Sequence, residues 1–234
     1  MKRFGQWIGS WACLALALSF GAIVHQLNQD ERAVQGCAEA LIKLATEREF
    51  AQWTPWGLVM RGWAMTQGGR LSEGIHEIRE GVAAFRATGA DVMVPYFLGL
   101  LAEGYLKSAQ AKEGLAVLAE AQAVIDRSRE CWWESELYRL KGEFTLMPSE
   151  GQSSTLQDDK AAEQHFHQAL NIANRQSAKL LELRAAMSLS RLWQKQGKQQ
   201  PEARRMLLDI YGSFTEGFNT TDLQHTKILL EELT

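Results

Sequence analysis

Proline and cysteine are scarce in this sequence, and strand patterns are missing from it. The 234 residues include 4 prolines and 3 cysteines, and no run of alternating β-branched residues is long enough to predict a strand. Cys13, Cys37 and Cys131 are odd in number and far apart, so they form neither a disulfide framework nor a zinc-ligand spacing. We expect buried free thiols in a reducing compartment and predict a helical, cytoplasmic protein.

An excess of basic charge is also missing. The net charge of −3 and the pI near 6.0 argue against a nucleic-acid partner, which usually meets a basic stripe. No spacing of Ser, His, Asp or Cys indicates catalysis, so no catalytic residue, cofactor-binding residue or cofactor is predicted. His165 and His167 are the only close histidine pair. Two residues apart on a helix, they point roughly 200° away from each other, so no metal site is predicted.

One uncharged stretch lies near the start of the chain, where no charged residue occurs between Arg3 and Asp30. Two interpretations are open. Residues 4–29 resemble a signal or membrane anchor, which predicts a membrane-associated or exported protein. Alternatively, they form a helix rich in small residues that packs on the next segment and completes an N-terminal hairpin in residues 1–50. We favour the hairpin, because the apolar run is about as short as a membrane span can be, and do not expect membrane contact.

Apolar residues recur at helical spacing through most of the chain. In one segment Leu115, Leu118, Ala121 and Ile125 form a stripe that we expect to face inward. Near the end, Thr221 and Gln224 have the spacing of a capping box, which predicts a helix start. The predicted helices span 8–27, 30–50, 56–67, 72–88, 95–107, 111–127, 132–147, 158–176, 179–196, 201–214 and 221–233.

Small residues mark a repeat of about 40 positions along these helices. Each set has a small residue, a second one about twelve positions later, then a large residue and a third small one, as in tetratricopeptide hairpins. The three sets are Gly62, Gly74, Ile78, Gly81; Ala102, Gly114, Leu118, Ala121; and Gly142, Ala162, Phe166, Ala169. The third set holds eight extra residues, which we place in a loop near 148–157. The prediction is an all-α, right-handed superhelical solenoid of tetratricopeptide-like hairpins, with repeats in 51–217 and a capping helix in 218–234.

Three strings carry a resemblance to a known family. They are Glu136-Leu-Tyr-Arg-Leu-Lys-Gly-Glu, the segment 182–193, and Phe214-Thr-Glu-Gly-Phe218. They resemble the C-terminal tetratricopeptide-like region of bacterial signalling proteins that carry a class III adenylate/guanylate cyclase domain and a STAND-type ATPase module. The chain departs from that architecture, because it has no G-x-x-x-x-G-K-[ST] phosphate loop and no paired cyclase aspartates. The resemblance therefore implies a regulatory, non-enzymatic region.

The leading hypothesis is a non-catalytic scaffold that binds a protein or peptide partner, senses a ligand, or contacts fused ATPase or cyclase domains. In stacked hairpins the first helices line a concave face, which is the usual binding surface. Exposed aromatic and polar residues on first helices are the expected contacts: Trp56, Tyr96, Glu103, Trp132, Tyr138 and Arg184. Two alternatives stay open: a fragment of a cyclase or ATPase whose catalytic domains lie outside this chain, and a membrane-anchored or exported repeat protein.

Overall fold

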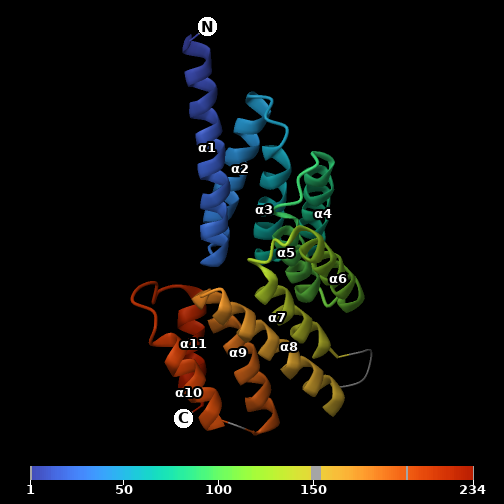
Figure 1. The fold of residues 1–234 in the computed structure, drawn as a ribbon, viewed down its shortest axis with the longest axis vertical. Helices are drawn as coiled ribbons and strands as arrows, with labels where there is room; N and C mark the ends of the chain where they lie inside the picture. Colours follow the sequence, from blue (N-terminus) through green and yellow to red (C-terminus); the bar gives the residue numbers. More distant parts are fainter. Residues whose placement is uncertain (1, 149–153, 199, 234) are drawn as a thin grey trace. The chain divides into compact units, whose positions relative to one another are not determined.

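A computed structural model describes residues 2–148, 154–198 and 200–233, with side chains from residue 11 onward (Figure 1). These described residues form eleven helices and no strand, which confirms the all-α prediction. The chain divides into two compact units, Met1–Ser108 and Ala109–Thr234. In each unit, helices that follow one another in the sequence pack against one another. This arrangement is compatible with a stack of helical hairpins.

The first unit holds the five helices at the blue to green end of the chain (Figure 1). Besides its sequence neighbours, α3 contacts both α1 and α5. The first helices of successive hairpins therefore lie against one another. The bounds are α1 (Lys2–Leu27), α2 (Glu31–Glu47), α3 (Trp53–Gln67), α4 (Leu71–Ala87) and α5 (Val94–Lys107).

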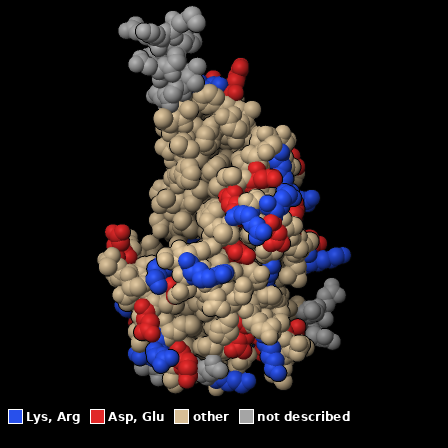
Figure 2. Space-filling model, in the orientation of Figure 1, with Lys and Arg blue, Asp and Glu red and all other residues tan. Residues whose placement is uncertain are grey.

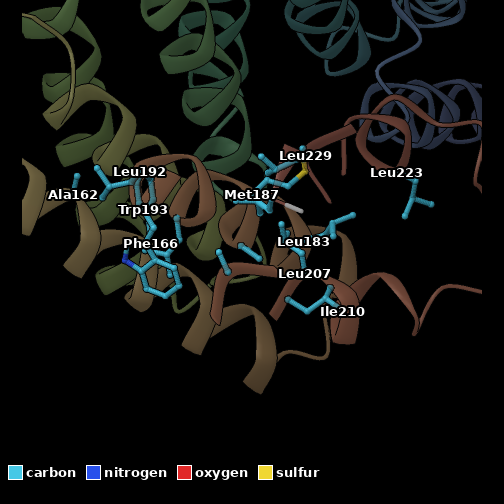
Figure 3. Packing of buried hydrophobic residues seen from close by; sticks show 14 residues of the cluster. Ala162, Phe166, Leu183, Met187, Leu192, Trp193, Leu207, Ile210, Leu223 and Leu229 are labelled. Carbon is cyan, nitrogen blue, oxygen red and sulfur yellow. The ribbon is translucent and has the colours of Figure 1, made fainter. Parts of the chain in front are cut away.

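The second unit repeats this arrangement, because α9 contacts α7 and α11 as well as its sequence neighbours. Its core joins the last four helices, with Phe166, Leu183, Trp193 and Leu207 among the buried side chains (Figure 3). The bounds are α6 (Ala111–Ser128), α7 (Glu134–Thr145), α8 (Leu156–Arg175), α9 (Lys179–Gln196), α10 (Gln200–Tyr211) and α11 (Thr221–Glu232).

Helix starts differ from prediction where capping decides them. The expected box of Thr221 with Gln224 is wrong: Thr220 is the N-cap of α11, and no side-chain capping bond forms there. A true capping box instead starts α8, where Thr155 and Asp158 satisfy each other's backbone N–H groups. The predicted insertion loop near 148–157 lies in large part outside the described residues, since 149–153 are not described.

The cysteines are less buried than expected. Cys13 and Cys131 are exposed, and Cys37 is half-buried. Burial raises the pKa of the Cys37 thiol, which favours the unreactive protonated form. The expectation of buried thiols is therefore wrong for two of the three residues, because Cys13 lies on the outer side of α1 and Cys131 in the turn before α7.

Two hydrogen bonds in the first unit join positions that the predicted 40-residue repeat makes equivalent. In the first unit, the indole Nε1 of Trp63 donates to Glu103 Oε2 at 2.9 Å. One turn further along the same two helices, Lys107 Nζ donates to Gln67 Oε1. Both pairs are 40 residues apart. Two positions on α3 therefore lie beside their counterparts on α5, as a stack of repeats requires.

The predicted close crossing of α3 and α4 is also present. A Cβ atom at Gly62 would lie 2.8 Å from the Gly74 carbonyl oxygen and 2.9 Å from the Ile78 nitrogen. Backbone atoms cannot yield to such a contact as a flexible side chain can. The crossing therefore requires glycine at position 62, which agrees with the small-residue repeat in the sequence.

We predict that Gly62→Ala destabilises the protein by about 2 kcal/mol, because the added methyl group overpacks this crossing by more than the helix propensity of alanine returns. Gly36→Ala is the matched control: Gly36 is exposed on α2, and a Cβ there meets nothing within 4 Å. That change should stabilise the protein by about 0.5–1 kcal/mol. Chemical unfolding of both variants measures the difference, and equal effects would contradict the crossing.

Candidate functional site

Trp56, one of the six expected contact residues, lies in an aromatic cluster of the first unit. Its indole ring is 5.5 Å from Phe97 and 6.3 Å from Phe85, both in edge-to-face geometry. The Trp56 side chain is only 6% exposed. The expected exposure is therefore wrong for Trp56, since α3 has packed neighbours on more than one side.

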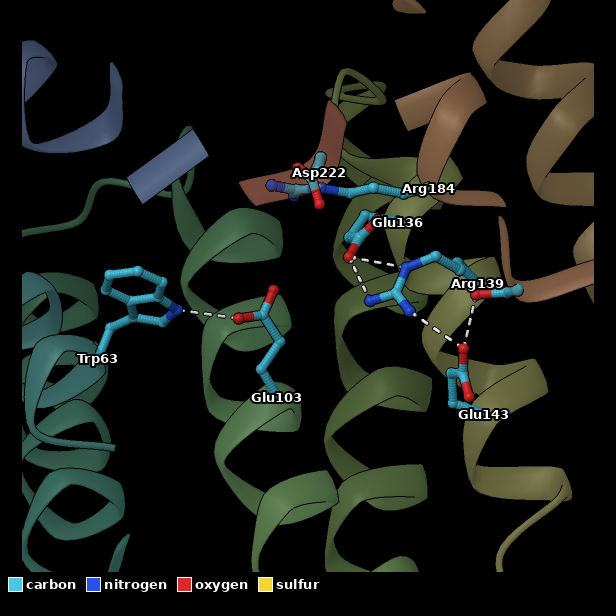
Figure 4. A network of polar contacts seen from close by, with 8 residues as sticks. Trp63, Glu103, Glu136, Arg139, Glu143, Arg184 and Asp222 are labelled. Carbon is cyan, nitrogen blue, oxygen red and sulfur yellow. Dashed lines mark hydrogen bonds and ion pairs between the residues drawn. The ribbon is translucent and has the colours of Figure 1, made fainter. Parts of the chain in front are cut away.

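Tyr96 and Glu103 both lie on α5, and each has a hydrogen-bonding partner inside the first unit. Tyr96 is fully buried, and its hydroxyl donates to Gln26 Oε1 of α1 at 3.0 Å. The expected exposure of Tyr96 is wrong. Glu103 is half-buried and accepts the hydrogen bond from Trp63 (Figure 4). The Tyr96 bond joins α5 to α1 and the Glu103 bond joins α5 to α3, so both groups hold helices together within the unit.

Arg184 lies on α9 in the second unit and is also buried, with 6% exposure. Its Nε donates to Asp222 Oδ2 of α11 at 2.8 Å. The expected exposure of Arg184 is wrong, because the guanidinium group joins two packed helices. Counting back 48 residues, 40 for the repeat and 8 for the insertion, Arg184 corresponds to Glu136 on α7.

Glu136 belongs to a buried ionic network in the second unit, which sequence reasoning did not identify. Arg139 donates to Glu136 Oε1 from Nε at 3.0 Å and to Glu143 Oε1 at 3.2 Å (Figure 4). The hydroxyl of Ser188 on α9 also donates to Glu143 Oε1, at 2.6 Å. Burial alone would raise the pKa of Glu136, but the charge and hydrogen bonds of Arg139, with the charge of Arg184, lower it overall. The carboxylate is therefore ionised inside the protein.

Trp132 and Tyr138 are the two expected contacts in the second unit that keep surface exposure. Trp132 lies in the turn before α7, where its Nε1 donates to Glu130 Oε1 at 3.1 Å, and it is 36% exposed. Its neighbour Trp133 is buried, as adjacent positions with different directions predict. Tyr138 is half-buried on α7, and its ring lies 6.2 Å from that of His165.

The histidine pair on α8 faces two different neighbours, as helical geometry predicts. His165 lies beside Tyr138, whereas His167 lies 6.1 Å from the ring of Trp193. Within the described part of the chain, no three His, Cys, Asp or Glu side chains gather closely enough to hold a metal ion.

An exposed apolar surface lies on α1, and it was not among the expected contact sites. Leu16, Phe20 and Val24 are 47%, 51% and 55% exposed. With Cys13 and Ala17, which are also exposed, they recur at the spacing of one helix face. We call these five residues the α1 outer face. The opposite side of α1 packs on α2 and α3.

The α1 outer face is uncharged, because no Asp, Glu, Lys or Arg occurs between Arg3 and Asp30. In Figure 2 the surface over the described part of α1, which Figure 1 locates, is tan. The outer side of α11 differs: Lys227, Glu231 and Glu232 are exposed there. A solvent-facing helix in a repeat stack usually carries such polar groups. Among the described residues, no helix has both the length and the hydropathy of a membrane span.

Two comparisons with known proteins found no relative of this chain. No protein-family model matches the chain, and a search of curated proteins gave no significant match.

Proposed function

We propose that this protein is a non-catalytic helical-repeat scaffold that acts through protein–protein interaction. The α1 outer face is the observation that supports this proposal most strongly. Exposed apolar patches on a folded protein mark interaction surfaces, because their burial releases water. The repeated 40-residue contacts support stacked tetratricopeptide-like hairpins, and that pattern favours a right-handed superhelix.

The partner that fits the α1 outer face is the same face of a second copy of this chain. An uncharged apolar helix face excludes charged partners, because a buried unpaired charge would cost several kcal/mol. The α1 helix of a second molecule offers the required uncharged apolar surface. Two identical faces can meet around a two-fold axis, which is the commonest symmetry of protein dimers.

The predicted regulatory role rests on the resemblance to cyclase–STAND ATPase proteins, and we keep it as part of the proposal. In that setting, a dimerising scaffold would bring two fused or bound signalling modules together. Trp56, Tyr96 and Arg184 are buried, so the proposal does not rest on those side chains. A cytoplasmic location remains our prediction from the sequence.

The dimer is tested with the double variant Leu16→Glu/Val24→Glu, which puts two carboxylates on the α1 outer face. We expect the wild-type chain to sediment as a dimer and this variant as a monomer with unchanged helical circular dichroism, since paired faces would bury unpaired charges. Leu156→Glu/Ile228→Glu is the matched control, because both side chains are exposed on other helices. It should remain dimeric.

Two results would overturn the proposal. One is a wild-type chain that sediments as a monomer at every concentration tested. The other is co-sedimentation of the wild-type chain with neutral phospholipid vesicles that the Leu16→Glu/Val24→Glu variant loses, because the α1 outer face would then be a membrane-binding surface.

A further inference from the structure

A hollow of about 400 Å³ lies in the second unit between α6 and α8, above α7. Within the described residues, α6 and α8 do not pack directly on each other, although both contact α7. The side chains of α7 therefore form the floor of a groove. Its lining residues are Leu115, Ala119, Gln122, Ala123, Asp126, Lys141 and His165. The hollow is open to solvent rather than enclosed.

One wall of the hollow is apolar. Leu115, Ala119 and Ala123 follow one another along α6 at one-turn spacing, and Leu115 is 43% exposed. The sequence predicted that Leu115 would face inward with Leu118, and that expectation is wrong: Leu118 is buried, whereas Leu115 opens into the hollow. The result is an accessible apolar surface beside charged groups.

The floor and the far wall carry polar groups. Lys141 Nζ donates to Gln122 Oε1 at 3.3 Å and lies 4.4 Å from the centre of the Tyr138 ring. The amide of Gln122 in turn donates to Asp126 Oδ1 at 3.2 Å and approaches Glu134 at 3.5 Å. One ammonium group and one carboxylate thus belong to the lining itself, with His165 facing them from α8.

The repeat shows what is unusual about Lys141. In the register of the small-residue sets, Lys141 corresponds to Arg61, and His165 corresponds to Glu77. In the first unit these positions form an ion pair, with Arg61 Nε donating to Glu77 Oε1 at 2.8 Å. In the second unit the acidic partner is replaced by histidine, so the cation meets no carboxylate from the second helix of its own hairpin.

The side chains of Lys141 and His165 are both partly buried. Burial lowers the pKa of Lys141, although the charges of Glu134 and Asp126 oppose this effect. Burial, and then the Lys141 charge, lower the pKa of His165, so the imidazole is neutral at physiological pH. A neutral imidazole can donate a hydrogen bond to an anion without adding a second charge to the site.

We infer that this hollow binds a free α-amino acid with an aliphatic side chain, such as leucine. The ligand carboxylate lies against Lys141 and the His165 imidazole, and the ligand ammonium group lies against Asp126. The aliphatic side chain covers Leu115, Ala119 and Ala123. A zwitterion matches a lining that carries one charge of each sign, because its carboxylate and its ammonium group can each lie against an opposite charge. This inference goes beyond the proposed scaffold function and does not depend on dimerisation.

The test is isothermal titration calorimetry of the full chain with three probes of similar shape. Leucine carries both charged groups, 4-methylpentanoate lacks the ammonium group and isoamylamine lacks the carboxylate. We expect leucine to bind at least about tenfold more tightly than either analogue, since each charged hydrogen bond contributes to affinity. Equal binding of 4-methylpentanoate and leucine would overturn the amino-acid assignment, as would the absence of binding by leucine.

The sharpest variant is His165→Glu, which recreates the pair that Arg61 and Glu77 form in the first unit. The introduced carboxylate would form an ion pair with the Lys141 ammonium group and compete with the ligand carboxylate. Leucine affinity should therefore fall at least about tenfold while the chain stays folded. Lys141→Met should abolish leucine binding independently. His167→Glu makes the same substitution on the exposed side of α8 and should bind leucine as the wild type does. Unchanged affinity in a folded His165→Glu variant would overturn the inference.

Discussion

Arg139→Met is expected to destabilise the protein by about 3–5 kcal/mol, because it leaves the Glu136 carboxylate buried without its main counter-charge. Glu136 is 1% exposed, so water cannot replace the lost guanidinium group. Met preserves most of the aliphatic volume of Arg. The loss of stability is therefore caused by the missing charge rather than by a cavity. Chemical unfolding monitored by circular dichroism measures the change in unfolding free energy.

The wild type and Arg139→Met should differ in unfolding free energy by an amount that depends on pH. This pH dependence distinguishes an effect of charge from an effect of packing. In the wild type the pKa of Glu136 is lowered, so its contribution to stability is present above the unfolded pKa and is lost as pH falls. In Arg139→Met, burial instead raises this pKa, and the variant regains stability as the carboxyl group protonates. The difference in unfolding free energy between the two proteins should therefore become smaller as the pH falls toward about 4.

The double variant Glu136→Gln/Arg139→Met is the control for the same network. It removes both charges, so it should recover much of the stability that Arg139→Met loses. If the single and double variants were equally destabilised at neutral pH, the effect would come from packing around Arg139 and not from the buried charge.

Trp56→Ala is expected to destabilise the protein by about 3–5 kcal/mol, which is the usual cost of truncating a buried tryptophan. The ring lies among Phe20, Phe85 and Phe97, and its removal leaves a cavity that these side chains cannot fill. The Trp56 indole Nε1 makes no hydrogen bond within the described residues, so packing accounts for the whole effect. Guanidinium unfolding measures it.

Trp132→Ala is the matched control for Trp56→Ala. Trp132 is partly exposed in a turn, so its truncation should change the free energy of unfolding by no more than about 0.5 kcal/mol. A large loss in Trp132→Ala, or a small one in Trp56→Ala, would contradict the burial of these two residues in the structure.

Periodicity predicted the helices well, because an apolar stripe at 3.6-residue spacing reports one buried face. It did not predict which first-helix residues are exposed. A first helix such as α3 packs on its hairpin partner and on first helices before and after it. Trp56 and Tyr96 therefore have neighbours on sides that a single-stripe pattern leaves to solvent. Arg184 was misplaced for another reason, since its partner Asp222 lies 38 residues further along the chain.

The insertion in the third hairpin kept the residues of the hollow from being recognised in the sequence. The cation at position 141 corresponds to Arg61 when two 40-residue steps are counted, but His165 corresponds to Glu77 only after eight inserted residues are removed. Once the register is corrected, the exchange of an acid for a histidine is visible in the sequence. The hollow itself is not visible there, because it forms where α6 and α8 do not pack on each other.

The hydrogen bonds from Trp63 to Glu103 and from Lys107 to Gln67 have a consequence for how this chain could be rearranged. Consensus repeats are interchangeable, and an array of them can be lengthened by copying one unit. Here α3 presents a donor, Trp63, and an acceptor, Gln67, that are matched by Glu103 and Lys107 of α5. A copied α3 hairpin would instead set Trp63 against a second tryptophan. The contacts between α3 and α5 therefore favour the native order of these two hairpins, and duplication of the α3 hairpin would lose both hydrogen bonds.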